Sequence, residues 1–447
     1  MRIAVLTIFE EGLGGGAGRA AYDLARCLAR HHDVALICPG RRKGVVKREG
    51  RLTIFSIPAK TKGNISAIRW NKKNLDAFKG ILDRFRPDVI HANDFIGIDF
   101  YGMLYAVERK IPFFYTGHVL PSKCLQFSVP KALSSGAQIL ERSIIKKYLV
   151  DFFKNCDGIV TMNKFNYADH AGFCPKRKLY IIPNGKNLRD YEKIRIASAK
   201  SPKNLIFIGF LSDRKNQAFL IRSMKYLPQE YRLILVGSEL YPGYRKKLER
   251  LAEENDVLSR VEFTGEVPYE TIPKQLSRAR VFVSASLMEV QSLVVLEALA
   301  SGRPVVGLRN ETISEVIDGS NGIALPRNSS PKRFADAVRS VVESDYDDYK
   351  KMCINARRSV KRFGWDSVEK QLIQMYSEGI KNYKPKSVNA VINTYKSWNK
   401  TLYSILYIAL FLDEGFRRLH PVRIASKIKR SIRKIKNRIV KGKTDLK

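Results

Sequence analysis

An alternation of short apolar runs with longer helical patterns, which occurs twice along the chain, constrains the fold more than any other feature. In the first half, strands rich in β-branched residues are predicted at 2–7, 33–38, 88–91, 112–116, 158–161 and 180–183. A second series of alternating strands and helices follows, with strands predicted at 204–209, 231–237, 261–264, 281–284 and 304–308. Strands that alternate with helices form parallel sheets, so we expect an α/β protein with two Rossmann-like, doubly wound domains that face a cleft.

The predicted domain boundary lies between the two series of strands and helices. We expect an N-terminal acceptor domain over 1–190, and a C-terminal donor domain over 191–383 whose final helix packs back. A separate basic tail covers 384–447. The connection between the two domains is rich in Lys, Arg, Ser and Ala, which suits an exposed linker.

The tail has the pattern of a basic amphipathic helix. Lys and Arg dominate it from Arg417 onward, and isoleucines recur at spacings of three and four at Ile424, Ile428, Ile432, Ile435 and Ile439. One apolar stripe on a basic helix is typical of segments that lie on a membrane, so anionic lipid headgroups are the expected partner. A merely solvated helix and nucleic-acid binding are the alternatives, the second being the weaker.

The net charge and the cysteine content indicate which partners and which cellular compartment to expect. A formal net charge of +37 favours anionic partners, and six cysteines without Cys-x-x-Cys spacing indicate neither a zinc site nor a disulfide framework. The first residues run directly into a strand rather than a signal peptide, and the longest apolar segment, 402–412, is too short to span a bilayer. We therefore expect a cytoplasmic protein, peripheral on the inner face of the cell membrane.

Two glutamates in the run 286–306 indicate the chemistry. Glu289 lies in a polar loop after a predicted strand, and Glu297 lies inside a helix predicted from about Leu293. Backbone amides near Ser292, Leu293 and Val294 at the helix start would lack intrahelical partners and face an anion. Glu297 has apolar neighbours on both sides, so its carboxylate must find partners. A phosphate flanked by sugars fits this arrangement.

This run resembles the signature of the retaining glycosyltransferases of group 1, the nucleotide-sugar-dependent family (family 4) that includes sucrose synthase. The resemblance extends over residues 1 to about 382 and implies the two-domain GT-B architecture. It implies that Glu289 positions hydroxyls of the donor sugar, Glu297 the ribose, Lys215 the diphosphate and His118 the sugar face. Further donor-binding positions implied by the family's motifs are Gly15, Gly16, Gly209, Arg214, Gly265, Val267, Ser292, Leu293 and Val294.

The chain departs from the family pattern at three places. Phe210 stands where an arginine normally helps to neutralise the diphosphate, and the neighbouring Arg214 is a conceivable substitute. Ser292 replaces the commoner glycine, and Lys186-Asn187 replaces the usual Ile-Asp. His91 also has a family counterpart, but packing at a strand end is its expected role.

The expected reaction is transfer of a sugar, with retention of anomeric configuration, from a nucleoside diphosphate sugar to a lipid or lipid-linked glycan. We expect no cofactor and no metal, since no Asp-x-Asp motif lies near a strand end. Two alternatives stay open: a soluble glycosyltransferase with a polysaccharide or small-molecule acceptor, and an inactive scaffold that binds nucleic acid through its basic tail.

Overall fold

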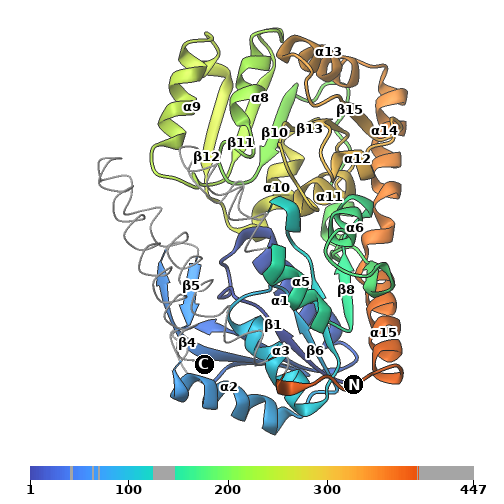
Figure 1. Ribbon diagram of the computed structural model, residues 1–447. Coiled ribbons are helices and arrows are strands. Elements are labelled where there is room, and N and C mark those ends of the chain that lie inside the picture. The colour runs from blue at the N-terminus through green and yellow to red at the C-terminus, as the bar shows by residue number, and fades with distance from the viewer. Residues whose placement is uncertain (41–43, 63–64, 69–70, 124–145, 390, 392–447) are drawn as a thin grey trace.

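The computed structural model describes residues 1–40, 44–62, 65–68, 71–123, 146–389 and 391 of the 447-residue chain. These residues form two α/β domains, one above the other in Figure 1, each built on its own sheet. The predicted α/β class and two Rossmann-like domains are confirmed. The predicted basic helical tail lies outside the described residues, apart from 384–389 and 391.

The first sheet has the strand order β3-β4-β2-β1-β6-β7-β8-β9, with β5 paired to β4. Neighbouring strands from β4 to β9 along this order are parallel. The strands are β1 (Arg2–Leu6), β2 (Asp33–Gly40), β3 (Gly44–Glu49), β4 (Leu52–Lys62), β5 (Ile65–Ile68), β6 (Val89–Ala92), β7 (Phe113–Thr116), β8 (Gly158–Thr161) and β9 (Leu179–Ile181).

Strands β3, β4 and β5 were not predicted. Both β3 and β5 pair antiparallel with β4, and Leu52, Ile54 and Ile57 of β4 are buried. An antiparallel edge that presents only part of its side chains to the core carries polar residues between the apolar ones. The continuous apolar run that marks the central strands is therefore missing from this stretch.

The second sheet is entirely parallel, in the order β12-β11-β10-β13-β14-β15. Its strands are β10 (Asn204–Ile208), β11 (Arg232–Val236), β12 (Val261–Gly265), β13 (Val281–Ser284), β14 (Val305–Leu308) and β15 (Gly322–Leu325). Alternate residues of β10 belong to different hydrophobic clusters: Leu205 and Phe207 to one, Ile206 and Ile208 to the other. Both faces of this sheet are therefore covered, as its near-continuous apolar strands require.

The helices connect these strands in the order that the rhythm of the sequence predicts. In the first half they are α1 (Gly15–Leu28), α2 (Lys72–Phe85), α3 (Ile98–Arg109), α5 (Lys146–Asn155), α6 (Lys164–Ala171) and α7 (Arg189–Glu192). In the second half they are α8 (Gln217–Met224), α9 (Tyr244–Glu253), α10 (Ile272–Ser277), α11 (Leu293–Ala300), α12 (Ile313–Val316), α13 (Pro331–Val342), α14 (Tyr346–Ser359) and α15 (Trp365–Lys381).

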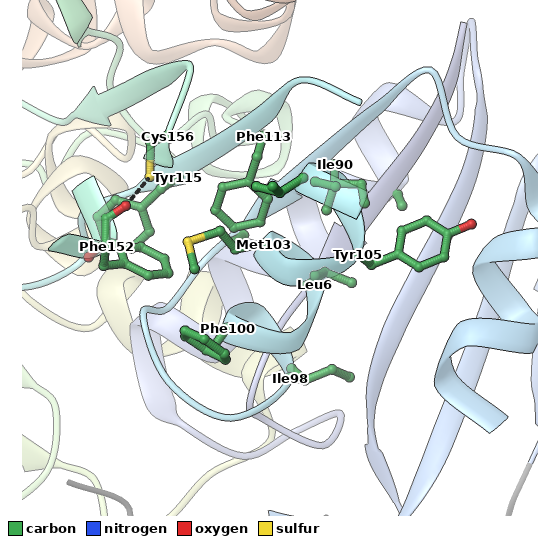
Figure 2. Packing of buried hydrophobic residues seen from close by; sticks show 14 of the residues in the cluster. Leu6, Ile90, Ile98, Phe100, Met103, Tyr105, Phe113, Tyr115, Phe152 and Cys156 are labelled. Atoms are coloured by element: carbon green, nitrogen blue, oxygen red, sulfur yellow. Dashed lines mark hydrogen bonds between the residues drawn. The ribbon is translucent and has the colours of Figure 1, made fainter. Parts of the chain in front are cut away.

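An aromatic cluster holds β7 of the first domain in place. Phe113 and Tyr115 of β7 meet the ring of Phe152 edge to face, with ring centroids 5.9 Å and 5.5 Å apart (Figure 2). Such pairs contribute roughly 0.5–1.5 kcal/mol beyond the burial of their area. Because β7 ends two residues before His118, this packing also fixes the start of the loop that carries His118.

The last described helix, α15, returns from the second domain and completes the core of the first. Val368, Leu372, Met375 and Tyr376 are buried there in one cluster with residues of β1, α1 and β2. Figure 1 shows α15 running along the side of the first domain. The polypeptide therefore passes between the domains twice, once before α7 and once before α15.

Candidate functional site

The start of α11 provides two unpaired backbone amides at the carboxyl end of β13. Ser292 is the N-cap, in an extended conformation, and its own amide donates to the Thr312 hydroxyl at 2.8 Å. The amides of Leu293 and Val294 have no hydrogen-bond acceptor within the part of the chain that the structure describes. Of the three amides predicted at the helix start, that of Ser292 is therefore bound by the Thr312 hydroxyl from the start of α12 and is not available to an anion.

Glu289 lies in the loop before α11 and is almost fully buried. Its Oε1 contacts Nζ of Lys215, and its Oε2 lies 3.6 Å from Nη1 of Arg214, which also donates to the Met288 carbonyl at 3.1 Å. Burial by itself raises the pKa of Glu289, but the charges of Lys215 and Arg214 outweigh it, so the pKa lies below its ordinary value. Glu289 is therefore ionised at neutral pH.

The loop between β10 and α8 supplies both cations. Gly209 begins it with a φ of 148°, and Lys215 ends it with a side chain that is 12% exposed. Burial lowers the pKa of Lys215, and the nearby Arg214 adds to that effect, while Glu289 opposes it. Arg214 thus lies against Glu289 rather than standing as an isolated surface charge.

Phe210 lies close to the start of α1 in the other domain. Gly15 has a φ of 57°, and a Cβ added to it would lie 3.1 Å from Cε2 of Phe210. A Cβ added to Gly16 would have nothing within 4 Å. The residue that replaces the usual arginine therefore packs against the first domain, while Gly16 faces open space.

Glu297 lies on α11, and its buried carboxylate has the partners that its burial requires. Tyr269 donates its hydroxyl to Oε1 at 2.5 Å, and Nζ of Lys186 lies 2.8 Å from the same oxygen. The same ammonium lies 3.7 Å from Oδ2 of Asp23, on α1 of the first domain. Neither Lys186 nor Tyr269 was predicted as a site residue, although Lys186 was visible as a departure from the usual isoleucine.

Gly265 and Val267 lie in the segment that leads to Tyr269. Gly265 ends β12 with a φ of 72°, and its carbonyl accepts the Gly237 amide at 2.8 Å. Val267 packs against the same hydrophobic cluster that contains α11. The segment that carries these two expected donor-binding positions thus packs on the helix that carries Glu297.

His118 follows β7, and its Nε2 lies 3.1 Å from Oδ1 of Asn93. Burial lowers the pKa of His118 to about 4, so the ring is neutral near pH 7. The residues after His118 approach the loop of Glu289, because Leu120 packs in one cluster with Met288 and Val290 of the second domain.

His91, by contrast, is enclosed in the first domain. Its Nδ1 lies 2.5 Å from the Tyr376 hydroxyl and its Nε2 lies 2.6 Å from the Thr116 hydroxyl, so both ring nitrogens are occupied. Its role is to join the end of β6 to α15.

Among the described residues, no group of three or more His, Cys, Asp and Glu side chains is arranged to hold a metal ion. Within the same residues, no helix combines the length and the apolar character needed to span a bilayer.

Two sequence families match consecutive parts of the chain. The family described as "Glycosyltransferase Family 4" matches residues 14–190, and "Glycosyl transferases group 1" matches residues 189–359. An uncharacterised glycosyltransferase of Methanocaldococcus jannaschii is 26% identical over 84% of this chain and 98% of its own length. The alpha-monoglucosyldiacylglycerol synthase of Streptococcus pneumoniae is 27% identical over 53% of this chain and 55% of its own length.

The fold also matches solved structures. The HepE protein of Anabaena, solved in complex with UDP-glucose, superposes with a TM-score of 0.64 at 18% identity, over 85% of this chain and all of that one. That similarity confirms the predicted GT-B architecture. Since the family matches run without interruption from residue 14 to residue 359, across both domains of that architecture, the chain belongs to the group 1 glycosyltransferases.

Proposed function

We propose that this glycosyltransferase moves a sugar, with retention of anomeric configuration, from a nucleoside diphosphate sugar to a lipid or lipid-linked glycan at the cytoplasmic face of the membrane. The observation that carries the proposal is the start of α11, where the free amides of Leu293 and Val294 stand in the sequence between the buried carboxylates of Glu289 and Glu297. Unpaired amides at a helix start favour a phosphate, and carboxylates favour hydroxyls. A diphosphate with a sugar on each side has these groups in this order.

Lys215 and Glu289 are assigned to the reacting side of the donor. Lys215 supplies a cation for the leaving diphosphate, and ionised Glu289 accepts hydrogen bonds from hydroxyls of the transferred sugar. Their direct contact offsets part of the cost of burying the two groups. Stabilising the charge that develops on the diphosphate is the main chemical task in such a reaction.

In the proposed step, the bond from the anomeric carbon to the diphosphate oxygen breaks, and a bond from the acceptor oxygen to that carbon forms on the same face. The proton of the acceptor hydroxyl passes to the departing phosphate oxygen, so the step requires no protein base. Neutral His118 contributes a hydrogen bond near the sugar rather than a charge, in keeping with its low pKa. Gly15 and Gly16 let the backbone of the first domain approach the donor.

The lipid part of the proposal has separate support. A relative that matches half of this chain is a synthase of a glucosylated diacylglycerol, and the sequence of the tail has the pattern of a membrane-surface helix. Anionic liposomes should therefore bind the full chain but not a chain that ends at residue 391. A truncated protein that still sediments with liposomes would move the membrane contact to the catalytic body, and equal binding to neutral vesicles would reject the electrostatic part.

The catalytic part is tested by a donor screen. Purified protein is incubated with UDP-, GDP- and ADP-sugars, and release of the nucleoside diphosphate is measured with and without diacylglycerol and lipid-linked acceptors. We expect release from one donor class, lost in Glu289→Gln and retained in the exposed control Glu254→Gln. Absence of release and of nucleotide binding for all donors would contradict the proposal. A product with inverted configuration, identified by NMR of the anomeric proton, would contradict the retaining part.

A further inference from the structure

Lys186 is a buried ammonium at a position where an apolar residue is usual in this family. Its side chain is 3% exposed, and Nζ lies 2.8 Å from Glu297 and 3.7 Å from Asp23. A buried charge is costly unless it is paired, and an apolar side chain of similar volume is often equally stable. The fold alone therefore gives no reason for a lysine here.

Tyr269 contacts the same carboxylate oxygen. Its hydroxyl donates to Oε1 of Glu297 at 2.5 Å and accepts from the Tyr191 hydroxyl at 3.0 Å. Because the second bond occupies a lone pair of the Tyr269 oxygen, its single proton is directed at Glu297. Burial, followed by the charge of Glu297, raises the pKa of Tyr269 well above its ordinary value, so the hydroxyl keeps that proton.

These two donors restrict the orientation of the carboxylate of Glu297. Both bind Oε1, so a further donor has to be received by Oε2. A carboxylate held at one oxygen cannot rotate freely about its last torsion. Its second oxygen is then presented in a fixed direction, as recognition of one particular hydroxyl requires.

The first domain contributes to the same arrangement. The guanidinium of Arg19 lies 3.3 Å from the centroid of the Tyr269 ring, and Nζ of Lys186 lies 4.7 Å from it. Arg19 and Asp23 are both on α1, after the glycines that begin this helix. Cations over an aromatic face are attracted by its quadrupole, so α1 holds the ring of Tyr269 as well as the ammonium.

We propose that Lys186 and Tyr269 are positioning residues that orient Glu297 toward a ribose hydroxyl, and thereby determine the preference of the enzyme for ribonucleotide over deoxyribonucleotide donors. This inference rests on the proposed function, in which Glu297 binds the ribose. Lys186 and Tyr269 act through Glu297, so their effect is on recognition of the sugar of the nucleotide and not on the chemical step.

The test measures a ratio of affinities. Dissociation constants of the preferred nucleoside diphosphate and of its 2′-deoxy and 3′-deoxy counterparts are measured by calorimetry for the wild type, Lys186→Ile and Tyr269→Phe. A hydroxyl bound to a charged acceptor should give the wild type a preference of roughly ten- to a hundredfold over at least one counterpart. We expect each variant to lower that ratio by about tenfold. Since each ratio compares ligands on one preparation, a reduced folded fraction does not alter it.

Lys203 offers a matched control. Its Nζ joins Glu230 at 3.0 Å and Glu343 at 3.2 Å and lies 5.2 Å from the ring centroid of Tyr231, which reproduces the same set of groups away from α11. Lys203→Ile should leave the ratio unchanged.

The outcomes separate this inference from the proposed function. The wild type could prefer the nucleoside diphosphate over a deoxy counterpart while Lys186→Ile and Tyr269→Phe show the same preference. In that case the positioning role is wrong and the proposed function stands. If the wild type binds the nucleoside diphosphate and both deoxy counterparts equally well, the assignment of Glu297 to the ribose fails and this inference fails with it. If the wild type binds no nucleoside diphosphate, the proposed function itself is overturned.

Discussion

Glu289 and Glu297 lie on one short segment but have different partners. Glu289 faces two cations of the loop before α8, whereas Glu297 has one cation and one neutral hydroxyl donor. The first arrangement suits a group next to a developing negative charge, and the second suits a group that holds a neutral diol. This difference leads to separable kinetic effects.

Glu289→Gln should mainly lower kcat, and Glu297→Gln should mainly raise KM for the donor. In the proposed roles, the first change alters contacts near the reacting carbon, and the second alters contacts to a ribose remote from it. Steady-state kinetics with the best donor measures both. Wild-type kcat and KM in both variants would contradict the assignment of these two residues.

Lys215→Met should cost more activity than Arg214→Met. Lys215 contacts Glu289 directly and is mostly buried, while Arg214 reaches the same carboxylate only at 3.6 Å and is 32% exposed. Loss of one charge-assisted hydrogen bond corresponds to about ten- to a hundredfold in kcat/KM. The opposite ranking would mean that Arg214 has taken over the diphosphate.

At the level of elements, the two glycines that begin α1 have different surroundings, which leads to different expected effects. Gly15→Ala should lower the free energy of unfolding by about 1 kcal/mol, since its φ is positive and its Cβ would crowd Phe210. Gly16→Ala should leave stability unchanged but raise KM for the donor, because its Cβ would enter open space. Thermal denaturation and donor kinetics measure the two effects, and equal stability of all three proteins would contradict the first.

The strands and helices of the first domain enclose three neutral histidines. Burial lowers the pKa of His91 to about 3 and those of His118 and His170 to about 4. Each takes up a proton near pH 6.5 when unfolded, so the stability that it contributes is present above that pH and is lost as pH falls toward 4. Asp94 acts in the opposite sense, because burial raises its pKa to about 8.

A single substitution isolates one of these histidines. His170 donates Nδ1–H to the Asn166 carbonyl at 2.9 Å, and its other nitrogen has no partner among the described residues. Between pH 6.5 and 4, His170→Gln should remove about 1.4 kcal/mol per pH unit from the slope of unfolding free energy. Denaturant titrations at several pH values measure the slope. An unchanged slope in His170→Gln would contradict the expected burial of a neutral ring.

Sequence reasoning located the central elements of both sheets because their apolar runs are continuous, with bounds that differ by a residue or two. It placed Glu289 and Lys215 in one site through their motifs, and the structure brings these two side chains into contact. It missed Tyr269, since a tyrosine beside a turn has no distinctive spacing and its partner lies 28 residues away. The role of Lys186 depends on a contact with α11, which no local pattern records.

At the scale of the whole molecule, α15 belongs to the core of the first domain although it follows the second in sequence. A Cβ added to Gly379 would lie 2.3 Å from Cζ of Phe114, and Tyr376 contacts His91. Ending the chain at residue 364 should therefore destabilise the first domain, by more than the 2–5 kcal/mol typical of one large core truncation. Hydrogen exchange at β1 and β7 measures it, with a chain ending at residue 391 as the control. Equal protection in both chains would contradict this prediction.

The return of α15 also has a consequence for synthesis on the ribosome. Domains generally fold as units, with the N-terminal one first. Here the segment that emerges first cannot bury the surface around Ile3, Val5 and Phe114 until the helix over 365–381 has been made. The nascent first domain therefore cannot complete its core, and keeps apolar surface exposed, while some two hundred further residues are added at ~5–20 per second. The second domain, whose sheet is complete by residue 325, is free to finish folding before the first.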